Sequence, residues 1–218
     1  MNKNKDNIKN PNPYIIGISG GSGSGKSTLV QRILSESSSL SSISLLKHDS
    51  YYLNQNEMPD YIGNAMNWDH PEALDNKLFI SHLTSLKNGH DISEPVYDYS
   101  THQRTNKTRT VHASSVIIVE GILILAIKEI RDQLDLSVFV ETPPEERIVR
   151  RILRDTQERN RTVESVVSQF RDTVRPMHNQ FVEPGKAHAN IIVPWDWGFQ
   201  NEPAIQMTKG FIKTILNP

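Results

Sequence analysis

The chain has 218 residues, 22% of them charged, and a formal net charge of −1. This near-neutral balance argues against broad electrostatic binding to nucleic acid or to a membrane surface. The sequence contains no cysteine, which excludes disulfides, thiolate metal sites and cysteine nucleophiles. No apolar run approaches the length of a membrane span.

The first residues differ in composition from the rest. Residues 1–13 are rich in Asn and Lys and lack the apolar core of a secretory signal, so we expect a disordered polar tail and a cytoplasmic protein. Residues 14–218 are enough for a single α/β domain with a substantial core.

A glycine-rich loop lies between an apolar run, Tyr14–Ser19, and a segment with helical character, Lys26–Leu34. Gly20–Ser27 fits G-x-x-x-x-G-K-[ST] at every fixed position, which is the motif of a phosphate-binding loop (P-loop). In such a loop the backbone N–H groups surround the phosphates, the lysine reaches the terminal phosphates, and the next hydroxyl ligates Mg²⁺. The residues expected to bind a nucleoside triphosphate with Mg²⁺ are Gly20, Gly21, Ser22, Gly23, Ser24, Gly25, Lys26, Ser27 and Thr28.

Predicted strands alternate with predicted helices along the rest of the chain. Apolar runs predict strands at Ile43–Lys47, Val116–Val119, Leu136–Val140 and Ile191–Val193. Helical patterns cover Pro71–Leu86, Pro144–Glu158, Thr162–Arg175 and Ala204–Leu216. Ser35–Ser42 is expected to be a loop and Leu53–Trp68 irregular, while Ile92–Tyr97 and Arg109–Val111 predict a hairpin at about residues 91–112. This order predicts an α/β P-loop NTPase fold with a mostly parallel central sheet flanked by helices.

Two acidic residues follow predicted strands, at the sheet edge where parallel sheets bind ligands. Glu120 ends the run Val116–Val119, and an acid at this place in a P-loop protein holds Mg²⁺ directly or through water. Asp49 follows Ile43–Lys47 and is placed to take a proton from an attacking hydroxyl. Taken alone, Asp49 is explained equally well as a turn or helix-cap aspartate.

Six arginines gather in and just after the predicted helix Pro144–Glu158, and Arg147, Arg151 and Arg154 share one face of it. Composition alone favours a solvated face paired with the neighbouring acids. A nucleic-acid patch is disfavoured because those acids are interleaved with the arginines. The remaining alternative is a helical lid, at about residues 144–175, whose guanidinium groups contact a transferred phosphoryl group and help to exclude water.

Several further segments resemble those of the uridine kinase (uridine–cytidine kinase) family, and they occur in the same order. N-W-D-H-P-E-A-L-D at 67–75 resembles the family's N-[FYW]-D-H-P-x-A-x-D, and P-V-Y-D-Y-S-T-H-Q-R at 95–104 resembles P-V-Y-x-[FY]-x-x-H-x-R. V-E-G-I-L at 119–123, R-R-I-L-R-D at 150–155, E-R-N-R at 158–161 and R-P-M…Q-F-V-E-P at 175–184 are similar to further family segments. The resemblance runs from about Ile16 to Pro194 and is far more specific than the loop motif alone.

The resemblance implies phosphorylation of the 5′-hydroxyl of uridine or cytidine by ATP or GTP, a step of pyrimidine salvage. Asp49 falls at the family's catalytic base, with Lys26 on the transferred phosphoryl group, and the implied Mg²⁺ group is Ser27, Asp49 and Glu120. The ribose positions are Tyr52, Asp69, Arg151 and Gln169; the base positions are Trp68, Tyr97, His102 and Arg161; the phosphate-contacting lid positions are Arg154 and Arg159. Relatives are often tetramers, so the resemblance also implies a homo-oligomer, with no nucleic-acid or membrane partner.

Ordinary explanations stay open for part of this set. Core packing would account for Trp68 and Tyr97, and a solvated loop for His102. The sequence also departs from the family at Asn160, where glycine is usual, and at His48, where an acid or amide is commoner. Pro194–Gly198 reads P-W-D-W-G instead of the typical P-R-G-G, in a loop near the donor nucleotide of relatives, which leaves the choice of ATP or GTP open.

Rival functions are distinguished by motifs. A phosphoribulokinase- or pantothenate-kinase-like enzyme would share the loop, but the segment with Tyr97 and His102 favours a nucleobase pocket. A GTPase-type switch would explain the D-x-x-G match at Asp60–Gly63, yet that match does not follow a buried strand and no [NT]-K-x-D motif is present.

Overall fold

The computed structural model of the chain describes residues 13–35, 42–63, 66–196 and 201–216. Three of the sequence predictions fall partly or largely outside these ranges. They concern the polar tail 1–13 except Pro13, most of the connector Ser35–Ser42, and the last two residues of the departing loop, Trp197 and Gly198.

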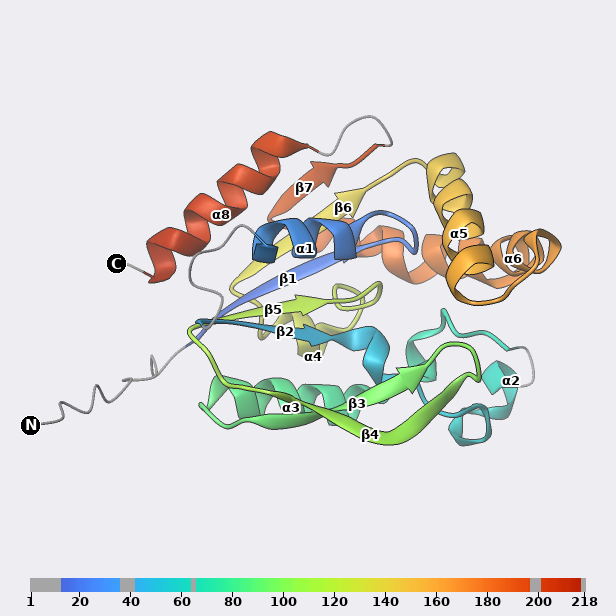
Figure 1. The fold of residues 1–218 in the computed structure, drawn as a ribbon, viewed down its shortest axis with the longest axis horizontal. Helices are drawn as coiled ribbons and strands as arrows, with labels where there is room; N and C mark the ends of the chain where they lie inside the picture. Colours follow the sequence, from blue (N-terminus) through green and yellow to red (C-terminus); the bar gives the residue numbers. More distant parts are fainter. Residues whose placement is uncertain (1–12, 36–41, 64–65, 197–200, 217–218) are drawn as a thin grey trace, which may run out of the picture.

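A parallel sheet of five strands forms the centre of the structure, in the order β2-β5-β1-β6-β7 (Figure 1). The strands are β1 (Tyr14–Gly20), β2 (Ile43–Lys47), β5 (Val116–Glu120), β6 (Leu136–Glu141) and β7 (Ile191–Pro194). All of β5 is buried, as expected of a parallel strand covered on both faces. The predicted parallel sheet and its strands are confirmed, with ends that differ by a residue.

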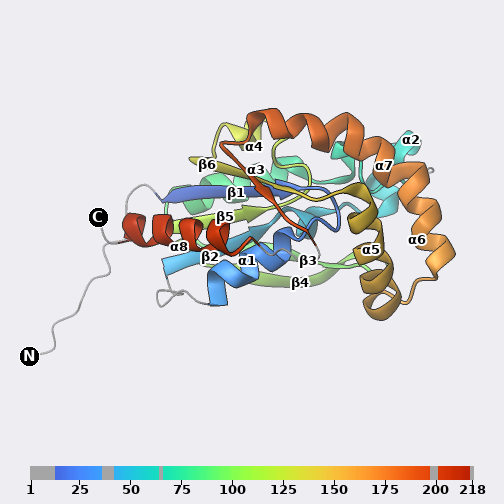
Figure 2. The ribbon, with the colours of Figure 1, turned by 90° about the horizontal axis from the view of Figure 1, so that it is seen from above.

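Helices cover both faces of this sheet, and the alternation of side chains along the strands decides which residues each face buries. Ile16 and Ile18 of β1 pack in the cluster that holds the apolar residues of α1 (Lys26–Ser35) and α8 (Glu202–Leu216). Ile15 points the other way, into the cluster beneath α3 (Asn76–Lys87) and α4 (Lys128–Arg131). Figure 2 shows the sheet between these two layers.

The remaining elements stand beyond the carboxyl ends of the strands or beside the sheet. β3 (Ile92–Asp98) and β4 (Gln103–Val111) form the expected antiparallel hairpin. Beyond the carboxyl ends of the strands, at the right in Figure 2, lie α5 (Pro144–Glu158), α6 (Val163–Gln169) and α7 (Arg175–Met177). The short elements are α2 (Asp60–Gly63) and 3₁₀ turns at His48–Tyr51, Gln55–Glu57, Pro71–Ala73 and Glu183–His188. None of the helices in the described ranges is long and apolar enough to cross a membrane.

Three predicted boundaries are wrong. The helix predicted from Pro71 begins only at Asn76, because Leu74 is extended and forms a β-bridge with Tyr52, while Asp75 caps α3 by accepting from the Leu78 N–H at 3.0 Å. The helix predicted to end at Arg175 continues to Val182 through two wide π-type stretches, Phe170–Val174 and His178–Val182. β4 starts six residues before the predicted Arg109, at Gln103, because its exposed polar side chains carry little strand signal.

Two loop residues other than glycine, Asn160 and His102, have a positive φ angle. Asn160, between α5 and α6, has a φ of +50°, so asparagine adopts here the left-handed conformation for which glycine is usual. His102 has a φ of +53° in the turn between β3 and β4.

Arg104 ties the hairpin to the segment that follows β2. Its Nε donates to the Tyr52 carbonyl at 2.8 Å and its Nη2 donates to the Tyr51 carbonyl at 2.7 Å. Its Nη1 lies 3.3 Å from the Asp75 carboxylate. One side chain therefore satisfies three groups of two separate elements.

We expect Arg104→Met to lower the free energy of unfolding by about 1–3 kcal/mol, because the carbonyls of Tyr51 and Tyr52 each lose a donor, and only Tyr51 keeps another, the Asp75 N–H. Urea unfolding followed by circular dichroism measures the change. Lys107→Met, at an exposed position of the same strand, is the matched control and should shift stability by less than about 0.5 kcal/mol. Equal midpoints for Arg104→Met and the wild-type protein would contradict this role.

Candidate active site

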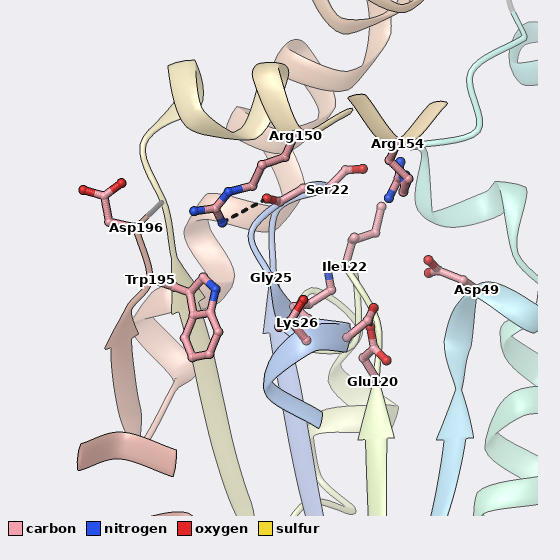
Figure 3. Close-up of a pocket in the computed structure, with 13 residues that line it drawn as sticks. Ser22, Gly25, Lys26, Asp49, Glu120, Ile122, Arg150, Arg154, Trp195 and Asp196 are labelled. Carbon is pink, nitrogen blue, oxygen red and sulfur yellow. Dashed lines mark hydrogen bonds between the residues drawn. The ribbon is translucent and has the colours of Figure 1, made fainter. Parts of the chain in front are cut away.

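The glycine-rich loop lies where β1 ends and α1 begins, at the carboxyl edge of the sheet (Figure 3). Gly20 has a φ of +145°, and a Cβ there would lie 2.4 Å from the Val140 carbonyl oxygen, so only glycine fits. The Lys26 side chain is buried and its Nζ donates to the Gly21 carbonyl at 3.1 Å. Burial lowers the pKa of Lys26, while the nearby carboxylates of Glu120 and Asp49 oppose this.

A cavity of about 420 Å³ lies over this loop. The predicted phosphate-binding residues that line it are Ser22, Gly23, Gly25, Lys26, Ser27 and Thr28, and the predicted Asp49, Glu120 and Arg154 line it too. Gly21 lines a neighbouring cavity instead, and Ser24 is fully buried. The cavity therefore brings together residues from the ends of β1, β2 and β5 with two arginines of α5, Arg150 and Arg154.

Two carboxylates and one hydroxyl meet at the floor of this cavity. The Ser27 Oγ donates to Glu120 Oε1 at 2.5 Å, and burial raises the pKa of Glu120 against the opposing effects of Lys26 and Ser27. The Oδ1 of Asp49 is buried and has no hydrogen-bond partner. Within the described ranges no group of three or more His, Asp or Glu side chains has metal-site geometry. Mg²⁺ needs only one or two protein carboxylates when phosphate and water supply the other ligands, so this donor set fits it.

A second, smaller cavity of about 60 Å³ lies beside the first. All eight residues predicted to hold the nucleoside line it: Tyr52, Trp68, Asp69, Tyr97, His102, Arg151, Arg161 and Gln169. The Trp68 and His102 rings stack with centroids 5.0 Å apart and an interplanar angle of 15°. A space of this volume holds only a few water molecules, so a nucleoside enters only when these rings or the facing helices move.

Two titratable residues of this cavity, His102 and Asp69, have shifted pKa values that bear on its chemistry. Burial lowers the pKa of His102, and the charges of Arg161 and Arg159 add to this, so the imidazole is largely neutral at pH 7. A neutral imidazole offers one hydrogen-bond donor and one acceptor. Burial raises the pKa of Asp69, with Arg151 opposing.

The arginines of α5 are not the solvated face that composition alone favoured. Arg147 and Arg151 are only 2% and 5% exposed, because this face of α5 packs onto the phosphate loop and α6. Asp155 is fully buried and lies 3.6 Å from Arg151, 2.7 Å from Arg154 and 3.5 Å from Arg159. A single carboxylate therefore holds three of the six clustered arginines.

Arg151 links the two cavities. Its Nη1 donates to Ser22 Oγ of the phosphate loop at 2.5 Å, and its Nη2 donates to Gln169 Oε1 of α6 at 2.9 Å. Gln169 also accepts from Arg161. Arg159, predicted at a phosphate-contacting position, instead lines the smaller cavity, where its guanidinium lies 4.4 Å from the centre of the Tyr99 ring.

Several residues of the two cavities were not singled out from the sequence. Tyr99 lines the smaller cavity, and Arg150, Trp195 and Asp196 line the larger one. Tyr99 lies inside the segment 95–104 and Arg150 inside R-R-I-L-R-D, so each had a signal in the family resemblance. Trp195 and Asp196 could not be found from the resemblance, because they lie in the loop where this sequence departs from the family.

The parallel sheet, the phosphate loop at its carboxyl edge and the arginine-bearing helices over that edge define a P-loop kinase. The chain belongs to the phosphoribulokinase/uridine kinase family, whose model matches residues 15–196. It is 46% identical to the uridine kinase of Clostridium perfringens over 204 residues, which are 94% of this chain and 97% of that protein. It is also 46% identical to the uridine kinase of Bacillus subtilis over 205 residues, 94% of this chain and 96% of the relative.

Solved structures agree on the fold. A structure described as a possible uridine kinase from Bacillus stearothermophilus superposes with a TM-score of 0.61 at 19% identity, covering 86% of this chain and 91% of that one. A D-glycerate 3-kinase from Cryptococcus neoformans superposes with a TM-score of 0.60 at 17% identity, covering 85% and 82% of the two chains. At this identity the likeness shows the P-loop kinase fold alone.

The buried Asp155 makes stability depend on pH in a defined direction. Burial alone would raise its pKa, but the hydrogen bond from Arg154 and the charges of Arg154, Arg151 and Arg159 outweigh burial and lower the pKa. Because the folded pKa lies below the unfolded one, the stabilising contribution is present above the ordinary aspartate pKa of about 4 and is lost as the pH falls through the folded value.

We expect Asp155→Asn to lower the free energy of unfolding by about 1–3 kcal/mol at pH 7. The deficit relative to the wild-type protein should shrink as the pH falls below about 4, because the unfolded wild-type chain takes up its proton there before the folded carboxylate does. Urea titrations between pH 7 and about 3 measure it. Asp172→Asn, which removes an exposed ion pair with Arg171, is the control and should change little. A deficit that stays constant across this pH range would refute the charge-pairing account.

Proposed function

We propose that this chain phosphorylates the 5′-hydroxyl of uridine and cytidine with ATP or GTP, giving UMP and CMP. One observation carries the proposal: eight side chains suited to a pyrimidine nucleoside surround one cavity, beside the phosphate-loop cavity and joined to it by Arg151. The uridine kinase relatives at 46% identity support the same substrate.

Chemistry supports a division of the smaller cavity into two ends. Tyr52, Asp69, Arg151 and Gln169 would hold the ribose, since a buried carboxylate such as Asp69 accepts from sugar hydroxyls. Trp68, Tyr97, His102 and Arg161 would hold the base. The neutral His102 donates to O4 of uracil or accepts from the N4 amino group of cytosine, which would let one pocket take both nucleosides.

The larger cavity would hold the donor. The backbone of Gly20–Thr28 and Lys26 would bind the phosphates, and Ser27, Asp49 and Glu120 would hold Mg²⁺, which when bound neutralises phosphate charge. Asp49 would accept the proton of the 5′-hydroxyl, since its buried Oδ1 has no other partner. Arg154 lines this cavity and would contact the transferred phosphoryl group, with Arg159 reaching it from the smaller cavity.

Residues 144–175 would act as a lid and residues 91–112 as the nucleoside-binding hairpin of a single kinase domain spanning 14–218. The volume of about 60 Å³ supports this assignment, because the cavity walls come from both of these parts and must separate to admit a nucleoside. By resemblance we also expect a cytoplasmic homo-tetramer that acts in pyrimidine salvage, without nucleic-acid or membrane partners.

The proposal is tested by incubating the protein with Mg²⁺ and either ATP or GTP, and with a panel of acceptors. Uridine and cytidine should yield monophosphates. Ribulose 5-phosphate and pantothenate, the acceptors of the alternative small-molecule kinases, should not react. Turnover of either one without turnover of uridine, or slow GTP hydrolysis without any acceptor, would favour a rival kinase or a GTPase-type switch.

Asp49→Asn should lower kcat by about 10²–10⁴, because a neutral amide cannot accept the proton of the acceptor hydroxyl. Nucleotide binding, measured by equilibrium dialysis, should stay close to that of the wild-type protein. Asp60→Asn, an exposed acid of α2, is the control and should keep full turnover. Near wild-type kcat for Asp49→Asn would remove Asp49 from its role.

Asp69→Asn should raise the KM for uridine by about 10–100-fold, since a hydrogen bond between a charged group and the sugar is lost. The KM for the donor nucleotide serves as the internal control and should change less than about twofold. An unchanged KM for uridine would show that Asp69 does not contact the nucleoside.

A further inference from the structure

The turn that carries Asp49 begins with a polar residue inside the core. His48 is fully buried at the first position of the 3₁₀ turn His48–Tyr51, directly before Asp49. It lines neither the larger cavity nor the smaller one, so it is placed to act through its neighbours and not on a ligand. Its contacts show which neighbours these are.

One hydrogen bond joins His48 to the start of α3. The Asn76 side chain is oriented by its Nδ2, which donates to the Pro71 carbonyl at 2.8 Å. Its Oδ1 therefore faces His48 and accepts from the Nε2–H of the imidazole at 2.9 Å. Within the described residues the Nδ1 of the same ring is buried without a hydrogen-bond partner, so the bond to Asn76 is the one that holds the ring.

Two close packing contacts fix the same side chain. The His48 ring lies against the Phe79 ring of α3, with centroids 4.6 Å apart. A Cβ on Gly121 would lie 2.5 Å from the His48 Cβ, so only glycine lets the turn approach this closely. Gly121 directly follows Glu120. His48 therefore connects the turn that carries Asp49 both to α3 and to the end of β5.

The place of the Asp49 carboxylate depends on the backbone that carries it. Its Oδ1 has no hydrogen-bond partner among the described residues, so no bond at that oxygen orients the side chain. β2 and β5 pair with Lys47 opposite Glu120, which leaves Asp49 two residues beyond the last pair (Figure 3). Arg104 holds the far end of this turn through backbone carbonyls, and His48 holds the near end.

We propose that His48 positions Asp49 to accept the proton of the acceptor hydroxyl, by holding the start of the turn against α3 and Gly121. The assignment rests on the function proposed above, in which Asp49 is the proton acceptor. His48 is a positioning residue, because it reaches neither cavity. Glutamine could make the same bond, since its side-chain amide also donates, whereas leucine fills a similar space without a donor.

The first test is steady-state kinetics with Mg²⁺, uridine and the better donor, ATP or GTP. His48→Leu should lower kcat by about 10–100-fold, because a catalytic group misplaced by about 1 Å loses that much. The KM values for uridine and for the donor should change less than about twofold. His48→Gln, which keeps a donor for Asn76, should stay within about threefold of the wild-type kcat. An unchanged kcat in His48→Leu, or equal losses in the two variants, would overturn the proposal.

A double-mutant cycle shows whether His48 acts through Asp49. Asp49→Asn already lacks the proton acceptor, so adding His48→Leu to it should lower kcat by less than about twofold more. A residue that merely supports the fold would lower kcat by the same factor in both backgrounds. Losses that multiply in the double variant would therefore contradict the proposal.

Asn76→Ala removes the same hydrogen bond from the other side, which keeps the test decisive if His48→Leu does not fold. It should lower kcat with little change in either KM, because Asn76 also reaches neither cavity. Lys77→Ala, at an exposed neighbouring position of α3, is the matched control and should keep full turnover. No turnover of uridine by the wild-type protein would overturn the proposed function and this assignment with it. Turnover that both His48→Leu and Asn76→Ala leave unchanged would overturn the assignment alone.

Discussion

Five parallel strands that end at one edge of a sheet are the constraint on which the rest of this molecule depends. β1 delivers the phosphate loop to that edge, β2 delivers Asp49 and β5 delivers Glu120. β6 leads into the arginine-bearing α5, and β7 leads into Trp195 and Asp196. Because the strands are bonded in register, groups spread along the chain from Ser22 to Asp196 converge on a cavity of about 420 Å³.

The second organising interaction is the burial of positive charge above that edge. Arg147 and Arg151 are almost fully buried, and the Nε and Nη1 of Arg147 have no hydrogen-bond partner. Burying unpaired donors and positive charge costs free energy when α5 packs on the phosphate loop. Asp155 offsets only part of this cost, through its ion pair with Arg151. If the larger cavity binds the phosphate donor, as proposed above, the polyphosphate would bring negative charge to this region and offset part of that cost.

The sequence predicted most of this architecture, because apolar runs and the loop motif are local signals. The prediction was wrong where contacts between distant residues set the ends of an element. The start of α3 depends on a bridge between Leu74 and Tyr52, and the length of the helical segment after Thr162 depends on π-type turns that no periodicity reveals. Composition could not tell a buried arginine from an exposed one, since α5 meets the phosphate loop only in the folded chain. The candidate nucleoside residues were predicted from the family-like segments and not from residue spacing. Tyr99 was missed although it stands at the [FY] position of the segment 95–104, and Asp196 was missed because its loop departs from the family's usual sequence.

The stack of Trp68 on His102 has a consequence for the order of events. If this cavity takes the acceptor, as proposed above, a base must part the two rings to enter, because the cavity measures only about 60 Å³. Water is the competing nucleophile in any phosphoryl transfer, so a cavity that opens only for the acceptor would limit hydrolysis of the donor. Part of the intrinsic affinity for the acceptor would then be used to separate two aromatic rings, which weakens apparent binding.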